Sequence, residues 1–126
     1  MSGMSEDRRI RLAGTFARYA EEARNRSAAI ADLAQGGMDT PDAWKGLVLH
    51  AHTLAGSGAA MGAEDISIAS RAIEVVVTEL SAARRAPTAD ERATLLALSG
   101  QLGVAVAAFD PEACLNAFLA KVYPRE

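Results

Sequence analysis

The sequence predicts an all-α fold, an up-down antiparallel four-helix bundle with a short C-terminal extra helix. Of its 126 residues, 50% are hydrophobic but only 5% are aromatic, and alanine is abundant. That composition suits closely packed helices better than a β-sheet. Apolar residues also recur every three or four positions through four long segments. Short connections between these segments imply antiparallel neighbours, and the length suits one domain over residues 1–126.

The first helix is predicted from Glu6 to Ala34, after a polar start in which residues 1–5 are expected to be frayed or disordered. We expect Gly36-Gly37 to end the helix, because glycine readily adopts positive φ. Its expected inward residues are Ile10, Ala13, Phe16 or Ala17, Ala20, Ala23, Ser27, Ile30, and Leu33 or Ala34.

The second helix is predicted from Pro41 to about Ala60, with Thr40 as its N-cap. Threonine followed by proline is a typical helix start, since Pro is favoured at the first helical position. The expected core stripe consists of Trp44, Leu47, Ala51, Leu54, Gly58 and Met61. Gly62 is expected to break or bend the chain after this helix.

Two further long helices and a short one complete the bundle. The third is predicted over residues 63–84, with Ile66, Ala69, Ser70, Ile73, Val76, Val77 and Leu80 inward. Thr88 and Glu91 form a predicted capping box for the fourth helix. That helix is expected to bury Leu95, Leu98, Leu102, Val106 and Phe109. Asp110-Pro111 starts a short terminal helix over residues 112–122.

Charge and cysteine content exclude several classes of function. The net charge is −3 and no basic run is longer than a pair such as Arg84-Arg85, which argues against a nucleic-acid surface. No apolar run of about 18 residues and no signal peptide are evident, so we expect no membrane contact. The single Cys114 cannot form an internal disulfide and is expected to be a small core residue. We therefore expect a cytoplasmic monomer.

The segment His50–Ala63 holds the most informative residues. Gly56, Gly58 and Gly62 stand there, although each glycine costs a helix about 1 kcal/mol relative to alanine. For Gly58 and Gly62 we expect the glycine to allow close packing. Gly56 instead suggests that another molecule approaches the helix surface.

Helical geometry places His52 at the boundary between core and solvent. At about 100° per residue, it lies about 110° from the middle of the core stripe. It is surrounded by Lys45, Leu49, Gly56 and Ala59, with Thr53 and Ala55 nearby. We expect Gly56 to leave access beside the imidazole and the others to form a partner-binding rim.

Two other types of site are disfavoured by the same geometry. His50 lies about 200° from His52 around the helix, so the two rings cannot share a metal ion. Ser57 diverges from His52 by about 140°, and no strand precedes a nucleophile motif, which argues against a hydrolase.

The pattern His-x-Leu-x-Gly-Ser-small-x-x-apolar-Gly-Ala over residues 52–63 resembles the phospho-accepting segment of histidine-containing phosphotransfer (HPt) domains. Ile73-Glu74 also falls where that family often has Leu-Glu. The resemblance implies that His52 accepts a phosphoryl group from a receiver-domain aspartate and passes it to another receiver. A neutral imidazole is a competent nucleophile at cell pH.

The resemblance also implies which partners and cofactors are needed. The expected partner is a response-regulator receiver domain or a hybrid histidine kinase. No cofactor is expected on this chain, because the receiver brings its own Mg²⁺, and no autophosphorylation is expected. The length and the complete bundle favour a free-standing domain.

One position departs from the family pattern and keeps a second hypothesis open. HPt domains usually have a lysine three residues after the histidine, where this chain has Ala55. The resemblance implies that such a lysine helps to hold the phosphate. The alternative function is therefore a helical adaptor that docks a receiver domain without carrying phosphate.

Overall fold

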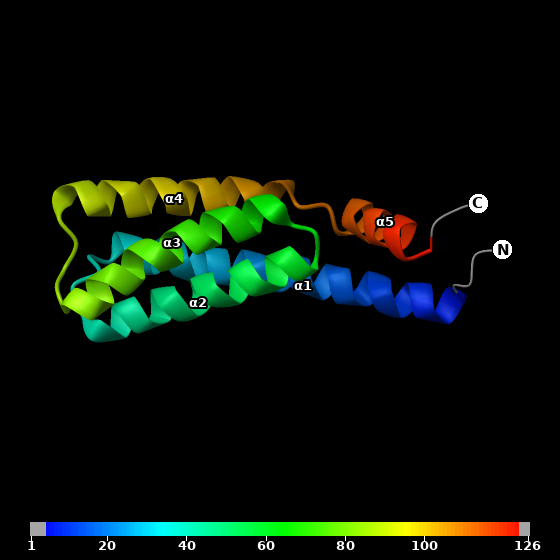
Figure 1. Cartoon of the computed structure of the whole chain (residues 1–126), viewed down its shortest axis with the longest axis horizontal. Helices are drawn as coiled ribbons and strands as arrows, with labels where there is room; N and C mark the ends of the chain where they lie inside the picture. Colours follow the sequence, from blue (N-terminus) through cyan, green and yellow to red (C-terminus); the bar gives the residue numbers. More distant parts are fainter. Residues whose placement is uncertain (1–4, 124–126) are drawn as a thin grey trace.

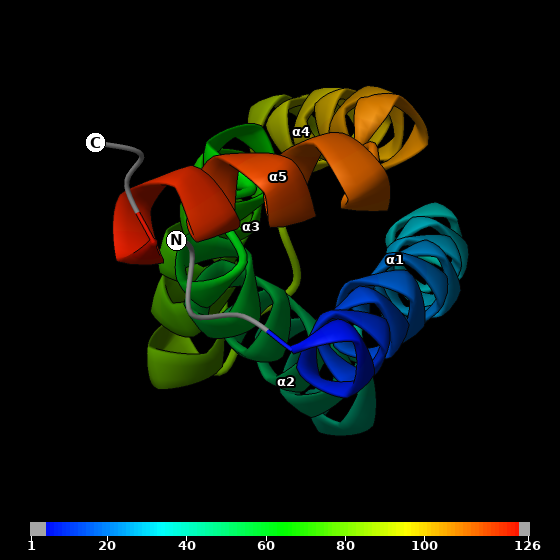
Figure 2. The same ribbon diagram turned by 90° about the vertical axis from the view of Figure 1, so that its right-hand side faces the viewer.

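The computed structural model describes residues 5–123, which form five helices and no strand. They are α1 (Glu6–Gln35), α2 (Pro41–Ala60), α3 (Glu64–Ala83), α4 (Ala89–Ala108) and α5 (Pro111–Val122). Each of the first four helices packs against the next one in the chain, α4 returns to α1 to close the ring (Figure 2), and α5 packs on α1. The predicted up-down four-helix bundle with an extra C-terminal helix is confirmed.

The helix starts follow the capping signals in the sequence. The hydroxyls of Thr40 and Thr88 accept hydrogen bonds from backbone N–H groups three residues later, and Glu91 completes the capping box. Ser5 caps α1 by accepting from the backbone N–H of Arg8. The expectation that the first residues are frayed also covers residues 1–4, which lie outside the described part of the chain.

The core lies between the four long helices. Its largest fully buried side chains are Ile30, Met38, Leu47, Leu54, Ile66, Ile73, Leu80, Leu95, Leu102 and Val77. The core stripe predicted for α2 is buried apart from Met61, which is only partly buried. In α3 and α4, Val76, Leu98 and Phe109 are likewise only partly buried, whereas Ser67 and Ser99 are buried instead.

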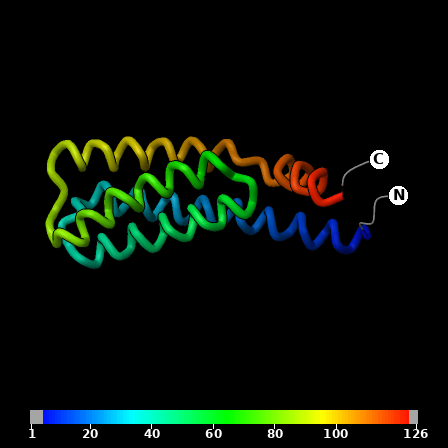
Figure 3. Tube along the Cα trace, viewed as in Figure 1, coloured from blue at the N-terminus to red at the C-terminus, as the bar shows by residue number. Residues whose placement is uncertain are grey.

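The N-terminal part of α1 does not belong to the four-helix core. Ile10 is 60% exposed and Ala13 is exposed, so their predicted inward orientation is wrong. The reason is visible in Figure 3: this part of α1 extends beyond the bundle, where α5 alone accompanies it. Arg8 donates to the Tyr123 hydroxyl and Arg9 to the Asn116 side-chain oxygen across this α1–α5 contact.

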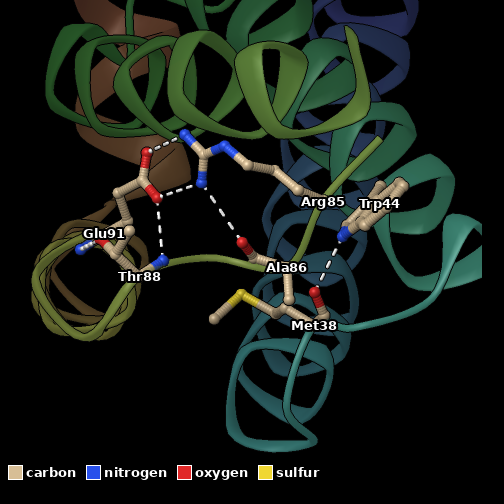
Figure 4. A network of polar contacts seen from close by, with 6 residues as sticks. All are labelled: Met38, Trp44, Arg85, Ala86, Thr88 and Glu91. Carbon is tan, nitrogen blue, oxygen red and sulfur yellow. Dashed lines mark hydrogen bonds and ion pairs between the residues drawn. The ribbon is translucent and has the colours of Figure 1, made fainter. Parts of the chain in front are cut away.

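Polar contacts hold the α1–α2 and α3–α4 connections, which lie at the end of the bundle away from α5 (the far end). Trp44 Nε1 donates to the Met38 carbonyl at 2.8 Å, and Met38 has φ 54°, a conformation unusual for a residue with a side chain. Arg85 contacts both carboxylate oxygens of Glu91 (Figure 4). These hydrogen bonds lower the pKa of Glu91 to about 2.

The turn between α2 and α3 lies at the opposite end, beside α5 (Figure 1). Gly62 has φ 73° there, as expected for a residue that breaks the helix. At the far end, Gly37 has φ 107° but Gly36 has φ −78°, so only the second glycine of that pair uses its freedom. The turn at Gly62 makes α2 and α3 antiparallel neighbours, which sets up the contacts described next.

Candidate functional site

His52 lies in the middle of α2, on the side of the helix next to α3. Its side chain is 74% exposed, and its Nδ1 lies 2.7 Å from Glu74 Oε2 of α3. The Glu74 side chain is only 25% exposed. The imidazole is therefore accessible to a large partner while one of its two nitrogens is held by the protein.

Four of the predicted neighbours share an exposed face of α2 with His52. Lys45, Gly56 and Ala59 are exposed, and Leu49 is 60% exposed. We call these four residues and His52 the His52 face. A Cβ added at Gly56 would meet no atom within 4 Å, so the surface beside the imidazole is open.

Thr53 and Ala55 lie outside the His52 face. Thr53 is half-buried, and its carbonyl accepts the Ser57 hydroxyl at 2.6 Å. Ala55 is 2% exposed, and its carbonyl accepts the Ser67 hydroxyl of α3 at 2.8 Å. We therefore remove Ala55 from the predicted partner-binding rim, because its side chain is in the protein interior.

The contact between His52 and Glu74 was not predicted from the sequence. In the sequence, Glu74 stands out only through the match of Ile73-Glu74 to a family pattern. A stronger signal was available: Ile73 belongs to the core stripe of α3, so Glu74 lies at the edge of that stripe. Which residue of α2 it meets depends on the alignment of the two helices, which the turn at Gly62 decides.

His50 occupies a separate environment on the other side of α2. Its Nδ1 lies 3.0 Å from Arg26 Nη1 of α1. Burial and the neighbouring Arg26 charge lower the pKa of His50. The two histidines thus contact different helices, as the predicted angle between them requires.

Three further features bear on other types of site: metal-ligating groups, the Cys114 thiol and apolar helices. Among residues 5–123, no three His, Cys, Asp or Glu side chains are grouped so that they could hold a metal ion. Cys114 is partly buried, and burial raises the pKa of its thiol. In the same range no single helix is long and apolar enough to cross a membrane, although α4 and α5, bent by 74°, satisfy length and composition criteria together.

Comparison with known proteins gives one result. The sequence matches the family model described as Hpt domain over residues 15–109. That range includes His52, Gly56 and Glu74, and it ends just before α5. Neither the curated proteins nor the solved structures include a match.

Proposed function

The chain belongs to the Hpt domain family, whose members carry out histidine phosphotransfer in two-component signalling, and on that premise we propose that it is a phosphorelay intermediate. His52 accepts a phosphoryl group from the aspartyl phosphate of one receiver domain and passes it to another. The observation that carries this proposal is the exposed imidazole whose Nδ1 is held by Glu74.

The Glu74 contact determines which ring nitrogen reacts. A carboxylate accepts hydrogen bonds, so Nδ1 carries the proton in this pair and donates a hydrogen bond to Oε2. In a neutral ring the lone pair is then on Nε2. Glu74 thus keeps His52 in the tautomer whose nucleophilic nitrogen is available to a partner.

The transfer step follows from this arrangement. The Nε2 lone pair attacks phosphorus, the N–P bond forms, and the bond between phosphorus and the aspartyl oxygen breaks. The carboxylate of the receiver leaves with the electron pair. The Nδ1 proton remains between the ring and Glu74, which stabilises the positive charge that develops on the imidazole.

The His52 face fits a partner that provides most of the catalytic apparatus. Phosphoryl transfer depends mainly on positioning and on neutralising charge, and the receiver would contribute Mg²⁺ for that purpose. Exposed Leu49 offers an apolar contact, and the open surface at Gly56 lets the partner approach the ring. We place Lys45 and Ala59 at the rim of the same docking surface, with Thr53 at its edge. We also propose that the protein is cytoplasmic.

The decisive experiment is phosphoryl transfer from a phosphorylated receiver domain to the purified chain. We expect an acid-labile, base-stable phosphate that is lost in His52→Gln. His50→Gln is the matched control, since His50 is on the same helix but contacts Arg26, and it should be labelled like the wild type. Equal labelling of His52→Gln and the wild type would refute the proposal.

A second function, a helical adaptor without phosphate, is favoured by Ala55. The cation usual at that position in the family is missing from this chain. In that case a receiver domain would bind the His52 face, Leu49→Asp would weaken the binding, and no receiver would label the chain. Stable labelling of His52 would rule the adaptor out.

A further inference from the structure

We propose that Arg71 of α3 binds the phosphoryl group on His52 and supplies the positive charge that position 55 lacks. This inference rests on the proposed function and deepens it, because it assigns a phosphate-binding residue to the same site. It rests on where Arg71 lies relative to two contacts between α2 and α3.

Those two contacts show which part of α2 lies opposite Arg71 of α3. Glu74 meets His52, and Ser67 meets the carbonyl of Ala55. Arg71 lies between Ser67 and Glu74 in the sequence, one turn from each, and residues three or four apart share a face of a helix. Because α2 and α3 are antiparallel, Arg71 lies across from the part of α2 that runs from His52 to Ala55.

The guanidinium has donors available for an anion. It is exposed, and Nη2 lies 3.5 Å from the Ser67 hydroxyl, at the long limit for a hydrogen bond. Within residues 5–123 this is its only side-chain hydrogen bond, and it has no ion pair there. Arginine has five N–H donors in a planar fork that matches phosphate oxygens, so most of them are free to bind one.

Charge balance gives a reason for a cation at this position. Phosphorylation places up to two negative charges near the Glu74 carboxylate, and like charges repel. Arg71 is one turn from Glu74 on α3 and can offset that repulsion. The open surface at Gly56 leaves room for the phosphoryl oxygens beside the imidazole.

The test uses phosphoramidate, a small donor that needs no partner protein. His52 Nε2 attacks its phosphorus, the P–N bond to the leaving nitrogen breaks, and ammonia departs with the electron pair. The wild type, Arg71→Gln and Arg71→Lys are compared for the level of phosphohistidine reached and for its rate of loss. Arg24→Gln, which removes an exposed arginine of α1, is the control, and His52→Gln reports labelling at other positions.

We expect the Arg71→Gln phosphohistidine to be less stable than the wild type by about fivefold, the size of an exposed charge interaction. Arg71→Lys should recover part of the loss, Arg24→Gln should match the wild type, and 1 M salt should shrink the difference. In a ³¹P NMR titration, the pKa of the phosphoryl group should be higher in Arg71→Gln. A purely structural role for Arg71 would leave that pKa unchanged.

Two outcomes separate this inference from the function on which it depends. If His52 is labelled but Arg71→Gln matches the wild type in phosphohistidine level, lifetime and phosphoryl pKa, the role of Arg71 is refuted while the proposed function stands. If the wild type is not labelled at His52 by phosphoramidate or by a receiver, the proposed function fails and the inference fails with it.

Discussion

At the site, one hydrogen bond joins an exposed side chain to a neighbouring helix. The His52 ring is largely in solvent, yet Glu74 fixes its orientation through Nδ1 at 2.7 Å. Holding one nitrogen of a histidine is how proteins set the tautomer and direction of the other nitrogen. The proposed nucleophile is therefore preorganised although it is not buried.

Glu74→Gln tests this preorganisation. Glutamine can still accept a hydrogen bond, but it can also donate one, and it brings no negative charge to stabilise the charged ring. We expect the rate of transfer from a receiver to fall about tenfold. This is the lower end of the loss in activity when the residue that orients a metal-ligating histidine is removed. Rates for Glu74→Gln and for the exposed control Glu79→Gln, measured with one receiver, check this. Equal rates for Glu74→Gln and the wild type would contradict it.

The His50–Arg26 contact predicts a pH dependence of stability. The pKa of His50 is lowered in the folded protein, so the unfolded chain binds more protons below about pH 6.5. The stabilisation from neutral His50 is complete above that pH and is lost as the pH falls towards the lowered value. Urea unfolding at pH 7.5 and 5.5 should show a larger loss for the wild type than for His50→Gln. An identical loss in both proteins would contradict this account.

Within α2, two glycines two residues apart are predicted to respond oppositely to alanine. A Cβ at Gly56 would meet nothing within 4 Å, whereas at Gly58 it would lie 3.2 Å from backbone atoms of both Ala63 and Ser67. We expect Gly56→Ala to raise the free energy of unfolding by about 0.5–1 kcal/mol. Gly58→Ala should lower it by about 1–3 kcal/mol, because α3 would have to shift. Chemical denaturation measures both variants.

This pair of variants also tests why Gly56 is present. If it were a packing residue, alanine would destabilise the protein there as well. A stabilising Gly56→Ala combined with slower transfer from a receiver would show that the glycine is retained for access to His52. Destabilisation by Gly56→Ala would contradict the open surface described for this position.

In the whole molecule, α5 is separate from the proposed phosphotransfer site. It packs on α1, where Phe118 contacts Phe16 with ring centroids 6.0 Å apart and Leu115 is buried. His52, Glu74 and Arg71 are on α2 and α3, and the matched family region ends at residue 109. We therefore expect α5 to contribute stability but no chemistry.

Deleting residues 111–126 tests this division. The deletion exposes Phe16 and removes Leu115, so we expect the free energy of unfolding to fall by about 2–4 kcal/mol. His52 should still be labelled by phosphoramidate at the rate of the full chain. Thermal unfolding followed by circular dichroism checks the loss of stability. Labelling at a temperature below the midpoint of unfolding checks the rate. Lost labelling in a folded truncated chain would contradict the separation.

Much of this molecule could be predicted from local patterns in the chain. The capping signals at Thr40 and Thr88 and the core stripe of α2 depend on residues within a few positions of one another, so they can be identified before any packing is known. The exposure of His52 followed from the same helical arithmetic. In α4 that arithmetic was weaker: apolar residues occur on all its sides, and Ser99 is buried where Leu98 was expected.

Other features were decided only when the helices packed. The expected inward orientation of Ile10 failed because an apolar stripe is buried only where a neighbouring helix covers it. Ala55 lies at the edge of its helix stripe, and contact with α3 moved it into the interior. The pairing of His52 with Glu74 joins residues 22 positions apart. It depends on how two antiparallel helices are aligned with each other. The periodicity within a single helix does not specify that alignment.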